Sequence, residues 1–127
     1  MSCFWDSLTQ ALTNEELRVL DIKRSTLELI KIIKLVNKLT PNVLWQGKPL
    51  SPKEMKENYE HVKNYDPKTY NQGYMTSSAD PFLILFAELF GWNITFNYNH
   101  NRINIKHKKP IRSVFFRASR SHFSVGR

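Results

Sequence analysis

The apolar pattern of this chain changes from a helical period to a strand period at Gly91. Before it, the apolar run Pro81–Phe90 follows a polar helix-start signal at residues 78–80. Gly91 suits the positive φ that ends many helices. After it, apolar and polar residues alternate over Asn93–Tyr98, as in a strand with one buried face. Because helical segments precede strand segments, the sequence predicts an α+β fold.

The first half of the chain carries further helix signals. A serine or threonine followed three residues later by glutamate begins at Thr13, Ser25 and Ser51, and this spacing is typical of a capping box. Apolar residues at helical spacing follow or precede these signals. We expect helices over Cys3–Leu12, from Thr13 toward Leu20, over Thr26–Leu39 and over Pro52–Lys63.

The last third predicts a small sheet. The polar residues 99–102 favour a hairpin turn between Asn93–Tyr98 and a strand over residues 103–106. A third strand is expected over Ser113–Ala118 and a short fourth over Phe123–Val125. The expected fold is one domain over residues 1–127, with N-terminal helices packed on a C-terminal antiparallel sheet.

Charge and cysteine content restrict partners and compartment. The net charge is +8, and residues 101–127 carry eight Lys and Arg and no acid, so nucleic acid is a candidate partner, while a solvated basic face is the simpler interpretation. A single cysteine excludes an internal disulfide. No apolar run is long enough to span a membrane and the N-terminus lacks signal-peptide features, so we expect a cytoplasmic monomer.

Cys3 and His122 are the candidate catalytic pair. Cys3 begins a predicted helix, and a helix N-terminus favours the reactive thiolate. His122 precedes the fourth predicted strand and could accept and return a proton. A buried structural cysteine is the alternative. With one cysteine and no Cys/His pair at ligand spacing, neither a metal site nor a cofactor is expected.

Four blocks resemble the ovarian-tumour (OTU) family of papain-type cysteine proteases. Residues 3–8, CFWDSL, resemble the nucleophile segment, and residues 74–90 resemble the loop and apolar helix of the middle block. Residues 93–98 resemble the strand that follows, and Ser121–Phe123 resembles the closing histidine motif. The blocks stand in the family's order and span nearly the whole chain, and the compact size is similar to that of viral members.

This resemblance implies a deubiquitinase. Its substrate would be ubiquitin or a ubiquitin-like modifier, cut after the C-terminal Gly-Gly, with a viral polyprotein as a further substrate and the host cytoplasm as its place of action. Cys3 would be the nucleophile and His122 the base, while Trp5 and Phe123 could wall the narrow substrate cleft.

Two positions depart from the family pattern. Ser124 stands where many members carry an Asp or Asn that orients the histidine, so Ser124 is the candidate orienting group and a Cys–His dyad is expected. Only Met1 and Ser2 precede Cys3, where the family has an Asp–Gly–Asn-like stretch that helps to form the oxyanion hole. Either this hole is built differently or the natural protein extends upstream.

Two other functions remain open on the sequence alone. One is a catalytically inactive OTU-like domain that only binds a partner. The other is a basic domain that binds RNA through residues 102–120, with exposed aromatic side chains as stacking groups.

Overall fold

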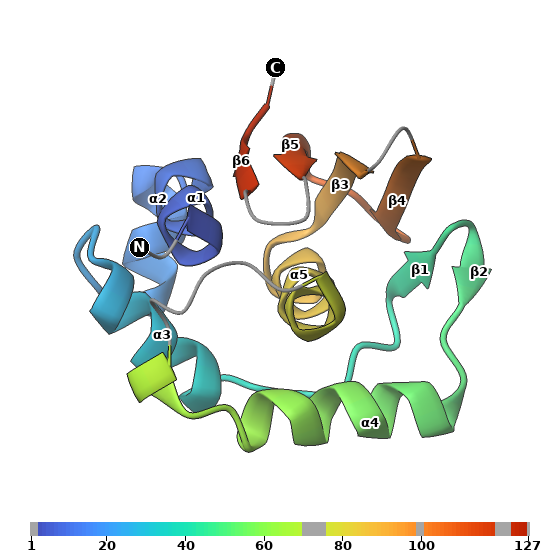
Figure 1. Cartoon of the computed structure of the whole chain (residues 1–127), viewed down its shortest axis with the longest axis horizontal. Helices are drawn as coiled ribbons and strands as arrows, with labels where there is room; N and C mark the ends of the chain where they lie inside the picture. The colour runs from blue at the N-terminus through green and yellow to red at the C-terminus, as the bar shows by residue number, and fades with distance from the viewer. Residues whose placement is uncertain (1–2, 70–75, 99–100, 119–122, 127) are drawn as a thin grey trace.

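The computed structural model describes residues 3–69, 76–98, 101–118 and 123–126, with the backbone alone for residues 3, 76–79 and 98. Five α-helices and a six-stranded sheet make up these residues, and the predicted α+β class is confirmed (Figure 1). The helices are α1 (Cys3–Ala11), α2 (Asn14–Leu20), α3 (Thr26–Leu35), α4 (Pro52–Lys63) and α5 (Thr76–Phe90), with a short 3₁₀ turn over Pro67–Thr69.

The predicted start signals cap three helices. Thr13 and Ser51 form reciprocal capping boxes with Glu16 and Glu54, and Pro52 occupies the first turn of α4. Ser25 accepts a hydrogen bond from the backbone N–H of Glu28 at the start of α3. These caps satisfy backbone N–H groups that have no partner within the helix.

Helix α3 ends at Leu35, four residues before its predicted end at Leu39. Val36, the C-cap residue, is partly buried against the core, but Leu35 and Leu39 are exposed by 82% and 51%, so a longer helix would bury little more apolar surface. Asn37 Nδ2 instead donates to the carbonyl oxygen of Tyr59 in α4, 3.0 Å away.

Helix α5 begins at Thr76, five residues before its predicted start, so Pro81 lies inside it. Residues 82–87 of α5 are all buried, because the sheet covers one side of the helix and α1 and α4 lie on others (Figure 1). Burial on every side outweighs the proline's missing hydrogen bond. Gly91 ends the helix at φ +66°, as predicted.

The strands are β1 (Val43–Trp45), β2 (Lys48–Pro49), β3 (Trp92–Tyr98), β4 (Asn101–His107), β5 (Arg112–Ala118) and β6 (Phe123–Val125), in the order β2-β1-β4-β3-β5-β6. The sheet is mixed, because β3 and β5 are parallel. The prediction of an antiparallel sheet was therefore wrong. One edge of β4 pairs with β3 and the other with β1, where Val43 lies opposite His107. After β4 the chain therefore returns to the free edge of β3, and β5 runs parallel to β3.

The hairpin β1–β2 was not predicted. Its strands have only three and two residues, too few to show an alternating pattern. The turn between them has positive φ at Gln46 (50°) and Gly47 (82°), the backbone of a tight hairpin turn. Such turns usually have Asn, Asp or Gly at the first of these positions, so the glutamine gave no turn signal in the sequence.

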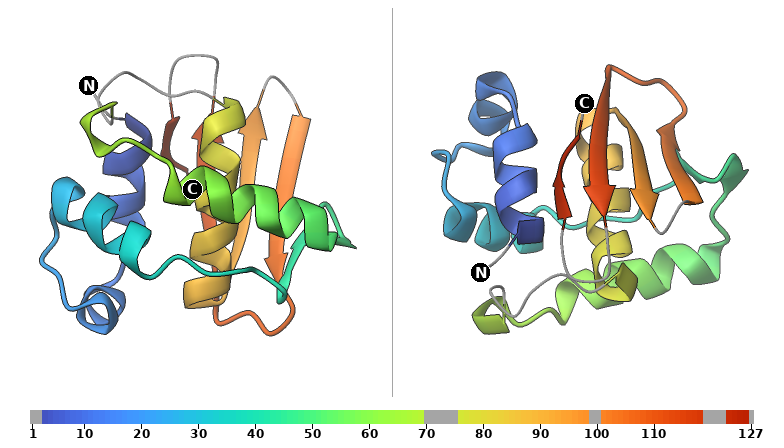
Figure 2. Two further views of the ribbon diagram at one scale, coloured as in Figure 1. Left: turned by 90° about the horizontal axis from the view of Figure 1, so that it is seen from below. Right: turned by 45° about the horizontal axis from the view of Figure 1, so that its top comes forward.

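The two faces of the sheet differ. The inner face packs on α5 through buried side chains in register, among them Ile94, Ile105 and Val114. We call the opposite side the outer face. No helix among the described residues covers it, and it turns toward the viewer in Figure 2 (right). No described helix is long and apolar enough to cross a membrane.

Candidate active site

Helix α1 begins at Cys3 and stands beside the edge strand β6 (Figure 1). Its apolar stripe is buried, with Phe4 6% and Leu8 0% exposed. The backbone of Cys3 opens the helix as predicted, and its side chain is outside the description. His122 lies outside the described residues, which resume at Phe123.

The contact between α1 and β6 is made by neighbours of the predicted pair. The rings of Phe4 and Phe123 meet edge to face, with centroids 5.1 Å apart. One turn further along α1, Ser7 Oγ donates a 3.0 Å hydrogen bond to the carbonyl oxygen of Phe123. Phe4 follows Cys3 in the chain and Phe123 follows His122. The fold therefore brings the segments on the C-terminal side of both predicted residues into contact.

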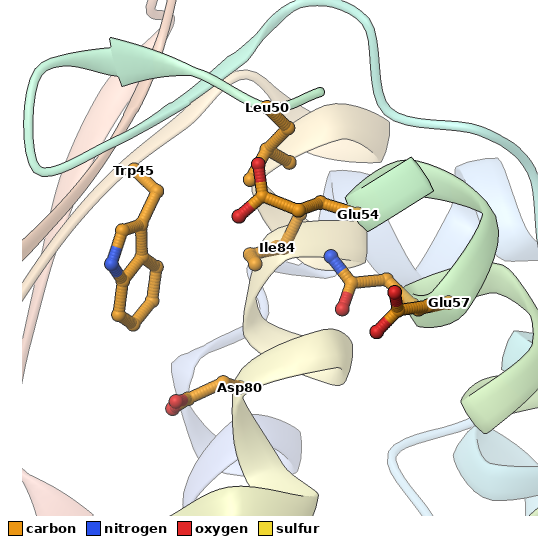
Figure 3. Close-up of a pocket in the computed structure, with 7 residues that line it drawn as sticks. Trp45, Leu50, Glu54, Glu57, Asp80 and Ile84 are labelled. Carbon is orange, nitrogen blue, oxygen red and sulfur yellow. The ribbon is translucent and has the colours of Figure 1, made fainter. Parts of the chain in front are cut away.

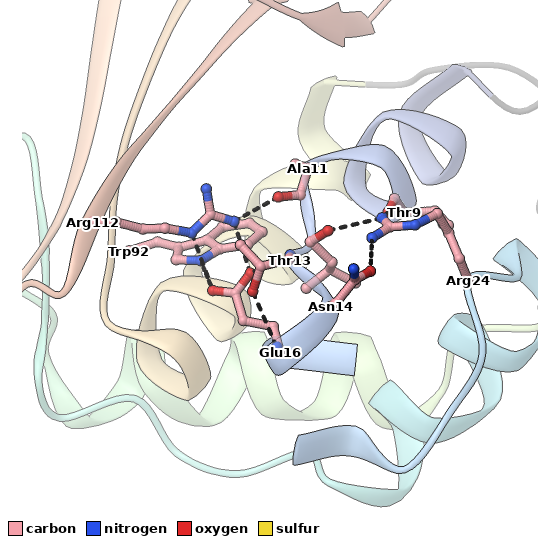
Figure 4. Close-up of polar contacts among 9 residues, drawn as sticks. Thr9, Ala11, Thr13, Asn14, Glu16, Arg24, Trp92 and Arg112 are labelled. Carbon is pink, nitrogen blue, oxygen red and sulfur yellow. Dashed lines mark hydrogen bonds and ion pairs between the residues drawn. The ribbon is translucent and has the colours of Figure 1, made fainter. Parts of the chain in front are cut away.

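Two arginines hold the C-terminal end of α1 (Figure 4). Arg24 Nη1 donates to the carbonyl oxygens of Thr9 and Leu12, at 2.7 and 2.8 Å, and Arg112 donates to the carbonyl of Ala11. These carbonyls have no partner within the helix, and cations there also complement the negative end of the helix dipole. Both arginines therefore anchor the end of α1 that is opposite to Cys3.

Arg112 also joins the sheet to α2. Its guanidinium lies 4.8 Å from the centre of the Trp92 ring and pairs with Glu16 at 2.7 Å, while Trp92 Nε1 donates to the same carboxylate (Figure 4). Burial by itself would raise the pKa of Glu16. Hydrogen bonds from Arg112, from the Thr13 backbone and from Trp92, together with the Arg112 charge, lower that pKa below its usual value.

Trp5 and Phe123, which the sequence interpretation assigned to the wall of a substrate cleft, are buried among the described residues of the core. Trp5 is 3% exposed and Phe123 0%. Trp5 Nε1 donates to the hydroxyl of Tyr65 at 3.0 Å, and the Phe123 ring lies 4.8 Å from that of Phe116. Trp5 packs α1 on Phe82 of α5 and on Tyr65, whereas Phe123 packs the sheet on Phe4 of α1.

Ser124 is half-buried in β6, opposite Arg117 of β5. Since successive side chains of a strand alternate between faces, Ser124 belongs to the outer face, opposite to the buried Phe123. Its relation to His122 lies outside the described residues.

One end of the sheet gathers the chain segments that carry the predicted chemistry. In Figure 2 (left) the N-terminal ends of α1 and α5 lie at the end where β3 finishes and β6 begins. The connection between β4 and β5, with Lys108 and Lys109, lies at the other end.

A pocket that the sequence did not indicate lies between α4, α5 and the β1–β2 hairpin (Figure 3). It is about 220 Å³ in volume, and Trp45, Leu50, Glu54, Glu57, Asn58, Asp80 and Ile84 line it. Burial raises the pKa of Asp80 to about 6, and its Oδ1 is buried without a hydrogen-bond partner among the described residues. Residues 78–80 were interpreted as a helix start. Because α5 begins at Thr76, Asp80 lies within the helix and not at its start.

Among the described residues, no group of three or more His, Cys, Asp or Glu side chains could hold a metal ion. Comparison with family models, with curated proteins and with solved structures gives no significant match. The function is therefore argued from this chain's own residues.

Proposed function

We propose that the chain is a cysteine protease in which Cys3 is the nucleophile and His122 the general base and acid. The observation that carries this proposal is the packing of α1 on β6, with 5.1 Å between the rings of Phe4 and Phe123. Each ring belongs to the residue that follows a member of the proposed pair. A thiol at a helix start with an imidazole held close to it is the arrangement that such chemistry needs.

The chemistry follows from these positions. His122 accepts the proton of the Cys3 thiol, and the partial positive charge of the α1 N-terminus favours the resulting thiolate, which attacks the scissile carbonyl carbon. Backbone N–H groups at the start of α1 would stabilise the developing oxyanion. His122 then protonates the leaving amine, leaving an acyl thioester on Cys3. His122 next removes a proton from water, which attacks the thioester and releases the carboxylic acid and the free thiol.

The OTU-like, papain-type fold is part of the same proposal. It is supported by the order of elements, with the nucleophile helix first, the apolar helix α5 leading into β3, and the histidine segment directly before the last strand.

The substrate class comes from the family resemblance. It is the bond after the C-terminal Gly-Gly of ubiquitin or a ubiquitin-like modifier, with a viral polyprotein as a further substrate in the host cytoplasm. A Gly-Gly tail requires a narrow approach to the thiol, because residues without side chains can pass where others cannot.

A covalent probe tests the proposal. Ubiquitin with a C-terminal electrophile should form an adduct that mass spectrometry locates at Cys3, the only cysteine. The same electrophile without ubiquitin, matched in concentration, controls for simple thiol access and should react much more slowly. Cys3→Ala and His122→Ala should form no adduct while their circular dichroism spectra stay unchanged.

Two results would contradict the proposal. Equal reaction of the free electrophile and of ubiquitin and ubiquitin-like probes would exclude these modifiers as substrates. Undiminished proteolysis by folded Cys3→Ala would exclude Cys3 as the nucleophile.

A further inference from the structure

The outer face carries a cluster of cations that the proposed protease chemistry does not use. Asn97 of β3 lies opposite Arg102 of β4 on one side and opposite Arg117 of β5 on the other. Cross-strand partners share a face and neighbouring strands are about 4.8 Å apart, so two guanidinium groups flank Asn97. Lys106, four residues after Arg102 in β4, points to the same face by the strand alternation.

These cations have no compensating acids. Arg102, Lys106 and Arg117 are exposed, and none makes an ion pair with a residue that the structure describes. No Asp or Glu follows Glu88 in the sequence, so the three strands β3, β4 and β5 contribute no negative charge. The outer face therefore has a positive potential and attracts polyanions.

An aromatic ring lies within this positive surface. Phe115 of β5 is only half-buried, and the Arg102 guanidinium lies 6.0 Å from its ring centre. Thr95 of β3 lies between Phe115 and Asn104 in register, and its hydroxyl hydrogen-bonds to the Asn104 side-chain oxygen at 3.1 Å. The ring is thus bordered by a cation and by side chains that can hydrogen-bond to a base.

We infer that the outer face binds single-stranded nucleic acid, a function separate from the proposed protease site. Arg102, Lys106 and Arg117 pair with phosphates, and a base stacks on Phe115. A sheet that combines cations with a stacking ring is suited to a single strand, because its bases are free to leave their neighbours. Bases in a duplex are stacked inside it and cannot reach Phe115. An acidic protein segment would use the cations and leave the ring without a stacking partner.

Binding of a fluorescein-labelled 12-nucleotide oligouridine, followed by anisotropy from 50 to 200 mM KCl, tests this inference. The variant Arg102→Gln/Lys106→Gln/Arg117→Gln should bind at least tenfold more weakly. Its slope of log affinity against log salt should fall by about 2, since each phosphate contact on a single strand contributes about 0.7. The matched control Lys31→Gln/Lys53→Gln/Lys56→Gln removes the same charge from exposed helix positions. It should change affinity less than about threefold.

Phe115→Ala separates stacking from charge. Loss of one stacked base should weaken binding by about tenfold and leave the salt slope unchanged. Phe115→Leu keeps the apolar packing in the sheet and should show the same loss of affinity. It replaces Phe115→Ala as the test if the alanine variant folds poorly. A 12-base-pair RNA duplex and polyglutamate should bind more weakly than the single strand and be insensitive to Phe115→Leu.

Three results would overturn the inference. The first is equal weakening by the two charge variants, which would indicate attraction by net charge alone. The second is full affinity in Phe115→Leu, which would remove the stacking role. The third is polyglutamate binding as tight as oligouridine, which would assign the face to an acidic protein.

Discussion

The Ser7 hydroxyl donates a 3.0 Å hydrogen bond to the main-chain oxygen of Phe123, and so joins the first helix to the last strand across 116 residues of sequence. Ser7 is 5% exposed, so the bond is sheltered from water. It lies one helical turn from the proposed nucleophile and one residue from the proposed base, and it therefore helps to fix the α1–β6 arrangement on which the protease proposal rests.

Ser7→Ala should lower the free energy of unfolding by about 1–2 kcal/mol, because it leaves a buried carbonyl without this donor. Urea denaturation measures the change. Ser113→Ala is the matched control, since Ser113 is exposed in β5 and should change stability by less than about 0.5 kcal/mol. Equal effects of the two substitutions would show that the Ser7 bond contributes nothing to the α1–β6 contact.

The roles of Ser124 and His122 should differ in size. Ser124→Ala removes at most one neutral hydrogen bond to the imidazole, worth about 1 kcal/mol, so kcat/KM on a ubiquitin substrate should fall about tenfold or less. His122→Ala should lower it by orders of magnitude, because proton transfer is lost. Comparable losses would mean that Ser124 is a full member of a triad and that the dyad is wrong.

The buried carboxyl of Asp80 should make stability depend on pH. Its pKa is about 6 in the fold, against an ordinary value of 3.8, so the folded state binds the proton more tightly than the unfolded chain. Well below pH 3.8 the group is protonated in both states and does not affect the free energy of unfolding. The destabilisation grows between about pH 4 and pH 6, and it reaches at most about 3 kcal/mol above that range.

Asp80→Asn removes this titration. The variant should be more stable than the wild type at pH 7.5, by about 1–3 kcal/mol, and nearly equal to it at pH 4. Thermal or urea unfolding at both pH values measures the difference. A gain of the same size at pH 4 would mean that packing, and not ionisation, limits stability at this position.

Glu16 should have the opposite pH dependence. Its folded pKa is lowered, so its contribution is present above its unfolded pKa of about 4.5 and is lost as the pH falls through the folded value. Glu16→Gln should therefore destabilise the protein at pH 7, by about 1–3 kcal/mol, because Arg112 loses its charged partner. The difference from the wild type should shrink below pH 4, and a difference that does not change with pH would argue against an ionic contribution.

The helix ends that depend on nearby residues were predicted correctly from the sequence. The capping boxes at Thr13 and Ser51 placed two helix starts correctly, and Gly91 placed the end of α5. Each depends on hydrogen bonds or backbone angles within a few residues. The end of α3 was missed because it depends on whether Leu35 and Leu39 are buried in the tertiary fold, and both are exposed.

Non-local pairing could not be inferred in the same way. The parallel pairing of β3 with β5 depends on β1 occupying the far edge of β4, and β1 is only three residues long. The candidate site shows the same limit. The sequence placed Cys3 at a helix start, but the contact of Phe4 with Phe123 depends on the tertiary fold, as does the burial of Trp5 and Asp80.

The lysines near the β4–β5 connection should not matter for hydrolysis. The β4–β5 connection, which contains Lys108 and Lys109, lies at the opposite end of the sheet from the start of β6 (Figure 2). The strand alternation puts Lys106 on the outer face. Exposed charges are screened beyond about 10 Å at ordinary salt. Neutralising all three to glutamine should therefore leave kcat/KM on a ubiquitin substrate within about threefold. The salt slope of oligouridine binding should fall by about 0.7, the contribution of Lys106 alone. A large loss of hydrolysis that added salt or substrate does not restore would place these lysines in the substrate site, and would move the proposed site away from the α1–β6 contact.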